Sequence, residues 1–155
     1  MDKHFKSKAI EAAYKKYNTK GILAVIDHCM VSGLRYASFA DDNGNSAQMK
    51  KPDLSINGLP SEVMVSDNWN NDGLPKYWRH IQIFKRKMHQ QAYTGGAWWM
   101  LNRNLTYALV LPFNAEAIGE KVYFDKGRNS REPVVLFRLK DAKLVKLAQS
   151  PCKNN

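Results

Sequence analysis

Cysteine and long apolar runs are both scarce in this sequence of 155 residues. The two cysteines, Cys29 and Cys152, form no CxxC pair, so we expect no disulfide framework and a reducing compartment. No apolar run approaches the roughly 20 residues that span a bilayer. The basic N-terminal segment also lacks the apolar stretch of a signal peptide. We therefore expect a cytoplasmic protein with no membrane partner.

Several motifs of metal and nucleotide chemistry are missing as well. The four histidines show no HxxxH or Cys/His spacing, which argues against a zinc site. No GxxxxGK[ST] loop and no dinucleotide fingerprint occurs, so nucleotide-driven chemistry is not supported. Asp27-His28-Cys29 has no nucleophile elbow beside it, and we expect Cys29 to be a buried residue rather than a nucleophile.

Positive charge, by contrast, is abundant. The chain has 24 Lys and Arg against 14 Asp and Glu, a formal charge of +10 that favours a polyanionic partner, nucleic acid first. Residues 41–72 contain six acids and two bases, whereas residues 73–115 contain six bases and no acid. A metal-dependent phosphodiesterase needs such an acidic pocket for its cation beside a basic surface for phosphates. Two solvated surfaces of opposite sign are the structural alternative.

Hydrophobic periodicity predicts a mixed α/β chain. Tyr77, Ile81, Phe84 and Met88 recur at helical spacing and predict a basic helix that ends at Gly95-Gly96. Further helices are expected at 3–17 and 140–149, with one helical turn within 114–120. Strands are expected at 21–29, 34–39, 53–56, 62–66, 97–101, 105–111, 120–124 and 133–139. We expect one domain over residues 1–150, with helices on a central sheet, and a frayed tail at 151–155.

Two acids stand out against this frame. Pro52-Asp53 opens one short strand, and Glu62 begins the next strand nine residues later. Carboxylates on adjacent strands can converge on one Mg²⁺, whose bound water then attacks a phosphodiester. Asp67 is a potential third ligand. The alternative interpretation is an ordinary turn Asp and an exposed strand Glu.

The order of these elements resembles the PD-(D/E)xK nuclease superfamily, and most closely the RecU-type Holliday-junction resolvases. The resemblance covers about Phe5 to Leu111. Its features are a basic first helix running into GILAVI, the PD dipeptide opening a hairpin, and an acid on the following strand. A basic, Gln-containing helix is then expected to run into the strands GGAWWML and LTYALVL. The resemblance implies a restriction-endonuclease-like fold, with a central mixed sheet flanked by helices, in a homodimer that cuts branched or duplex DNA with Mg²⁺ or Mn²⁺.

The chain departs from this family at its lysine. The family motif needs Lys at position 64, two residues after Glu62, but Met64 occupies it. The missing lysine normally orients the water and stabilises developing charge. Lys87 or Lys51 would have to take its place, and we select Asp53, Glu62 and Lys87 as the catalytic set. The alternative is a nuclease-fold protein that has lost catalysis and binds nucleic acid or recruits a partner; a basic RNA-binding protein is a third interpretation.

The basic segment with its flanking aromatic residues is typical of a surface that contacts the DNA backbone. A solvated face beside core aromatics is the structural alternative. The residues that we expect to contact nucleic acid are Arg79, Gln82, Lys85, Arg86, Lys87, His89, Gln90 and Arg103.

Overall fold

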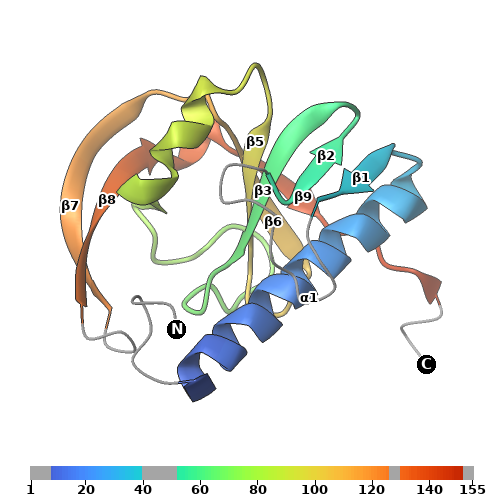
Figure 1. The fold of residues 1–155 in the computed structure, drawn as a ribbon, viewed down its shortest axis with the longest axis horizontal. Coiled ribbons are helices and arrows are strands. Elements are labelled where there is room, and N and C mark those ends of the chain that lie inside the picture. The colour runs from blue at the N-terminus through green and yellow to red at the C-terminus, as the bar shows by residue number, and fades with distance from the viewer. Residues whose placement is uncertain (1–7, 40–51, 126–129, 152–155) are drawn as a thin grey trace.

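The computed structural model describes residues 8–39, 52–125 and 130–151 of this chain. Helix α1 (Lys8–Ser32) packs on one face of a six-stranded sheet, and a three-stranded sheet packs on the other face (Figure 1). The expected α/β class with a mixed sheet is confirmed. The second sheet was not expected, because strand partners far apart in the sequence leave no local signal.

The six-stranded sheet has the order β1-β2-β3-β5-β6-β9. The β3–β5 pair is parallel and every other neighbouring pair is antiparallel. The three-stranded sheet has the antiparallel order β4-β8-β7. The strands of the first sheet are β1 (Tyr36–Ser38), β2 (Leu54–Ile56), β3 (Leu59–Val65), β5 (Ala97–Leu101), β6 (Tyr107–Pro112) and β9 (Lys143–Lys146). Those of the second are β4 (His80–Phe84), β7 (Ala117–Asp125) and β8 (Ser130–Arg138).

The predicted strand at 21–29 is wrong, because α1 continues through this segment to Ser32. Ile22, Val25 and Cys29 are buried at positions that share one face of a helix, and they pack on the sheet. A short apolar run fits a buried helix as well as a buried strand, so periodicity alone could not separate them. The expected burial of Cys29 is confirmed.

The predicted helix from Tyr77 toward Gly95-Gly96 is also wrong. Its first half is strand β4, and its second half is the 3₁₀ helix η1 (Lys85–Ala92). Ile81 and Ile83 alternate into the core, while Tyr77 is 93% exposed. Pairing of β4 with β8, about 55 residues further along the chain, overrides the local helical pattern. The long helix that the resemblance implied is therefore a strand followed by a short helix.

Smaller differences concern the C-terminal third. The helix predicted at 140–149 is wrong, because this segment contains β9 after the 3₁₀ turn η2 (Leu139–Asp141). The helical turn within 114–120 is replaced by the start of β7. The other strand predictions are confirmed to within a few residues, the one at 34–39 only as the three-residue β1. Residues 41–51, which include Lys51, and the tail beyond residue 151 lie outside the described residues.

Two apolar clusters lie on opposite faces of the six-stranded sheet. Val25 and Leu101 belong to the cluster under α1, and Trp98 and Phe137 belong to the cluster between the two sheets. Glu62 is the register partner of Trp98 in the parallel β3–β5 pair. Its side chain therefore projects from the sheet face opposite α1, toward the three-stranded sheet and η1.

Candidate active site

The β2–β3 hairpin brings the two predicted acids together. Asn57 and Gly58 form its two-residue turn with φ angles of 52° and 83°, as in a type I′ turn. Leu54 pairs with Ser61, so Asp53 and Glu62 occupy the next facing position of the hairpin. Both are buried, at 5% and 8% exposure. The short turn thus places two carboxylates on one face of the sheet, in contact with each other.

The pKa values of the two carboxyl groups shift in opposite directions. The backbone N–H of Val63 donates to Asp53 Oδ2 at 2.9 Å. Burial, together with the hydrogen bond and charge of Glu62, raises the pKa of Asp53 to about 8. Burial also opposes ionisation of Glu62, but hydrogen bonding to Asp53 and the charge of Lys87 outweigh it and lower the pKa of Glu62. Near neutral pH this environment favours a single proton shared by the pair.

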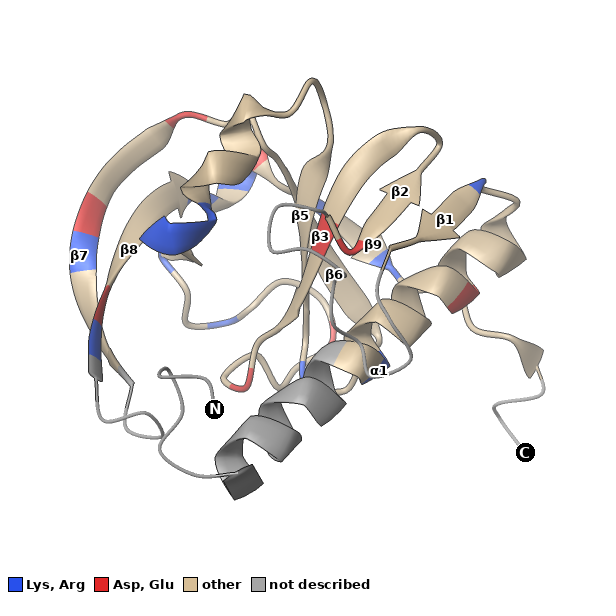
Figure 2. Cartoon of the chain, viewed as in Figure 1, with Lys and Arg blue, Asp and Glu red and all other residues tan. Residues whose placement is uncertain are grey.

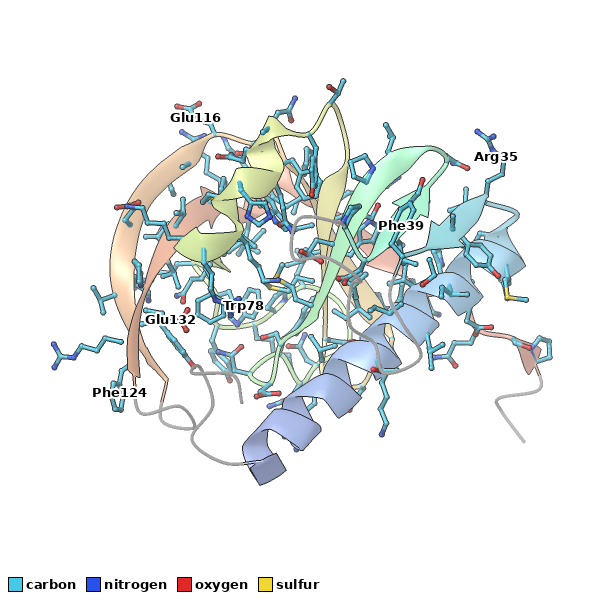
Figure 3. The ribbon with its side chains drawn as sticks, viewed as in Figure 1. Arg35, Phe39, Trp78, Glu116, Phe124 and Glu132 are labelled. Carbon is cyan, nitrogen blue, oxygen red and sulfur yellow. The ribbon has the colours of Figure 1, made fainter. Side chains whose placement is uncertain are left out.

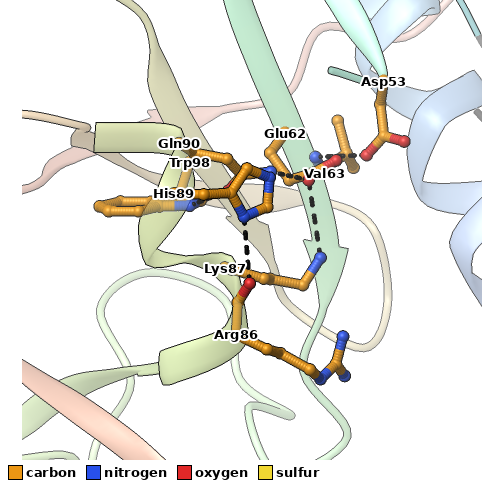
Figure 4. A network of polar contacts seen from close by, with 8 residues as sticks. All are labelled: Asp53, Glu62, Val63, Arg86, Lys87, His89, Gln90 and Trp98. Carbon is orange, nitrogen blue, oxygen red and sulfur yellow. Dashed lines mark hydrogen bonds and ion pairs between the residues drawn. The ribbon is translucent and has the colours of Figure 1, made fainter. Parts of the chain in front are cut away.

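Lys87 supplies a cation at this pair (Figure 4). Its Nζ lies 3.6 Å from Glu62 Oε2, and its side chain is 18% exposed. Lys87 reaches the acid from η1, whereas Met64, on the same strand face as Glu62, packs against the core between the sheets. The structure therefore brings Asp53, Glu62 and Lys87 into one site.

Gln90 is the second η1 residue at Glu62. It is 2% exposed, and its Nε2–H donates to Glu62 Oε2 while its Oε1 accepts from Trp98 Nε1–H at 2.5 Å (Figure 4). The sequence placed Gln90 on a DNA-contacting surface, but the side chain is part of the buried site. Trp98 was missed, since its approach depends on the parallel β3–β5 pair, which no local pattern indicated. Tyr93 was missed too; burial and the Glu62 charge raise its pKa.

The carboxylate pair fits a hard divalent cation. Mg²⁺ and Mn²⁺ prefer oxygen ligands, and Mg²⁺ binds through one or two carboxylates while keeping several waters. Within the described residues, no three His, Cys, Asp or Glu side chains are close enough to share a metal. Asp67 does not join the pair, because it is exposed and lies five residues beyond Glu62, roughly 16 Å along an extended strand.

The basic run of η1 meets acids that come from elsewhere in the chain (Figure 2). Lys85 Nζ lies 3.1 Å from Glu120 Oε1. Arg86 Nε lies 3.2 Å from Oε2 of Glu132, a β8 residue labelled in Figure 3. Residues 73–115 contain no acid, but β7 and β8 place Glu120 and Glu132 beside the bases of this segment. The Lys85–Glu120 pair is exposed on both sides, and such pairs contribute only about 0–1 kcal/mol, so a phosphate can compete for Lys85; the Glu132 side chain is only 15% exposed.

The remaining residues expected to contact nucleic acid are dispersed. Arg79 is exposed just before β4, and Gln82 is half-buried on that strand. His89 is exposed on η1, where its Nδ1 lies 3.1 Å from the Arg86 carbonyl oxygen. Arg103 is exposed beyond the end of β5 that is remote from Trp98. Only the η1 residues thus lie beside the acids.

Asp27-His28-Cys29 has a structural role in α1. Asp27 Oδ2 accepts the backbone N–H of Ser150, and His28 Nδ1 accepts that of Ala148, both at 2.9 Å. Burial lowers the pKa of His28 and raises the pKa of the Cys29 thiol. These side chains therefore hold the C-terminal segment against the helix.

Neither α1 nor the short helices of the described segments is long and apolar enough to cross a membrane. In comparisons with known proteins, no family model, no curated protein and no solved structure matches this chain.

Proposed function

We propose that this protein is a DNA-binding protein of the restriction-endonuclease-like fold that hydrolyses phosphodiester bonds in branched or duplex DNA with Mg²⁺ or Mn²⁺. One observation supports the proposal most: Lys87 lies beside the buried Asp53–Glu62 pair. The site thus has the three charged groups of a PD-(D/E)xK centre, although position 64 is methionine.

Each residue has a distinct role in this proposal. Asp53 and Glu62 would hold the cation, whose positive charge would favour the ionised form of both carboxyl groups. A bound divalent cation supplies an acidified water and stabilises negative charge on the phosphate. The Lys87 ammonium would help to orient a water at this site, and it adds a positive charge beside Glu62.

The exposed bases of η1 position the DNA. Lys85 and Arg86 are exposed and belong to the same eight-residue helix as Lys87. A phosphate backbone that displaces Glu120 and Glu132 from these bases comes to lie next to the carboxylate pair. Contacts of this kind position the duplex without reading its sequence.

A specific observation favours the alternative of a binding protein without catalysis. Lys87 already neutralises Glu62, and no third metal-type ligand joins the pair within the described residues. In this alternative, the ion pair is a structural element, and η1 binds nucleic acid or a partner without cleavage.

Cleavage assays on a four-way DNA junction and on a linear duplex of the same sequence distinguish these proposals. We expect the wild-type protein and Asp67→Asn to cut with Mg²⁺ or Mn²⁺, and neither to cut in EDTA. Asp53→Asn should cut nothing, because it loses a cation ligand, and in EDTA it should bind DNA as tightly as the wild type, because protonated Asp53 carries no negative charge there either. Binding without cleavage by the wild type supports the alternative. Absence of DNA binding overturns the proposed nuclease function.

A further inference from the structure

We infer that Trp98 is a positioning residue for Glu62, because its indole N–H determines which end of the Gln90 amide faces the carboxylate. The inference rests on the proposed function in one respect, namely that Glu62 is a cation ligand. Figure 4 shows the three side chains in sequence, from Trp98 through Gln90 to Glu62.

Donor and acceptor chemistry defines the direction of this chain. An indole N–H only donates, so it selects the Oε1 of Gln90 as its partner. The Nε2–H₂ group of Gln90 must then point the other way, where it donates to Glu62 Oε2. In a flipped amide, the NH₂ group of Gln90 would face the indole N–H, and its oxygen would face the Glu62 carboxylate. Neither contact could form a hydrogen bond. Trp98 therefore makes one of the two amide orientations strongly preferred.

Burial makes this preference effective. Trp98 is fully buried, and Gln90 and Glu62 are 2% and 8% exposed, so bulk water does not replace a lost partner. Packing also sets the direction of the indole. Its ring lies 4.9 Å from the Phe113 ring at 80° and 5.6 Å from the Phe137 ring, measured between centroids.

The consequence for Glu62 is a defined carboxylate orientation. Both the Gln90 amide and the Lys87 ammonium contact Oε2 of Glu62, so together they fix the orientation of the carboxylate that also contacts Asp53. Partners that orient a metal ligand in this way commonly change metal affinity by about 10–100-fold when removed. Trp98 does so through Gln90, without touching the cation.

The test uses the full chain and Mn²⁺ alone as the probe, with free Mn²⁺ measured by electron paramagnetic resonance. Trp98→Phe keeps an aromatic ring but removes the N–H, and we expect about tenfold weaker Mn²⁺ binding. Gln90→Leu should weaken binding at least as much. The double variant should bind like Gln90→Leu alone, since Trp98 acts through Gln90. Trp99→Phe is the matched control, because Trp99 belongs to the cluster on the other sheet face, and its affinity should stay within about twofold of the wild type.

A second measurement does not depend on metal. In ¹⁵N-tryptophan-labelled protein, Gln90→Leu should shift the Trp98 indole N–H resonance and leave the Trp69 indole, which donates to the Gly73 carbonyl, unchanged. The same spectra show whether each variant is folded. An unshifted Trp98 resonance overturns the inference.

The outcomes separate the inference from the proposed function. Mn²⁺ binding that is equal in the wild type and Trp98→Phe overturns the inference alone. Additive losses in the double variant also overturn it, because Trp98 would then act by packing. No Mn²⁺ binding by the wild type overturns the proposed function and the role of Trp98 in cation binding with it.

Discussion

Asp53 and Glu62 face each other across the β2–β3 hairpin, one position beyond the Leu54–Ser61 pair. Both carboxyl groups are buried, and Lys87 Nζ lies 3.6 Å from Glu62 Oε2. Two adjacent buried carboxylates resist simultaneous ionisation. This relationship makes the hairpin a site whose charge state responds to pH and to cations.

Stability should depend on Asp53 in a pH-dependent way. The folded-state pKa of about 8 lies above the value of 3.8 for an unfolded chain. The stabilisation from protonated Asp53 is therefore fully present below about pH 4 and is lost as the pH rises through about 8. Asp53→Asn stays neutral, so its free energy of unfolding should exceed that of the wild type by at least ~1 kcal/mol near pH 8, with a smaller difference near pH 5.

Urea unfolding at several pH values measures this difference. Asp67→Asn is the control, because Asp67 is exposed and outside the site. Its difference in unfolding free energy from the wild type should not vary with pH. An Asp53→Asn offset that is constant or shrinks toward pH 8 would contradict the pKa of Asp53.

A lysine introduced at position 64 should partly restore the cleavage that is lost when Lys87 is removed. Lys87→Met removes the cation beside Glu62 and should lower the cleavage rate by about 10²–10³-fold, the usual effect of losing one electrostatic stabiliser. Met64 lies on the same strand face as Glu62, two residues away, so Met64→Lys should recover at least about tenfold in the Lys87→Met background. Single-turnover cleavage gives both rates. Lys140→Met, at an exposed position on η2, serves as the control. Full activity of Lys87→Met would exclude Lys87 from the chemistry.

The exposed bases of η1 should set the salt dependence of DNA binding. Each neutralised phosphate contributes about −0.9 to the log–log slope of affinity against salt. Lys85→Gln with Arg86→Gln should flatten that slope by up to about 2. Fluorescence anisotropy with labelled duplex DNA measures it. Lys140 and Lys143 are exposed residues on and near β9, and changing both to Gln should leave the slope unaltered. Equal flattening in that variant would show that DNA binding is not localised to η1.

Gly96 should be the least replaceable glycine near the site. Its φ is +94°, and an added Cβ would lie 2.1 Å from the backbone oxygen of Pro60. Gly96→Ala should therefore cost more than ~3 kcal/mol of unfolding free energy or prevent folding, because backbone on β3 would have to move. Gly58→Ala has a similar φ of +83° but open space around it, so it should cost about 1 kcal/mol. Thermal unfolding compares the two, and equal losses would argue against close packing of Gly96 on Pro60.

Local sequence was sufficient for the acid pair. The dipeptide Asn57-Gly58 favours a two-residue type I′ turn, and the strict alternation of strand residues then places Asp53 opposite Glu62. The strands predicted at 97–101 and 105–111 were confirmed for the same reason, since an antiparallel neighbour close in sequence reinforces the local pattern.

Long-range pairing decided the rest. Ile22, Val25 and Cys29 are apolar enough for either a helix or a strand, and only packing of α1 on the sheet made them helical. Ile81 and Ile83 became a strand because β8 offered a partner about 55 residues away. Parallel pairing of β3 with β5 brought Trp98 beside Glu62, and the intervening η1 carried Lys87 and Gln90 to the same carboxylate. Residue type thus determined which side chains could hold a cation. The crossover between two parallel strands determined which of them meet, because contacts between residues far apart in the sequence are not encoded in local periodicity.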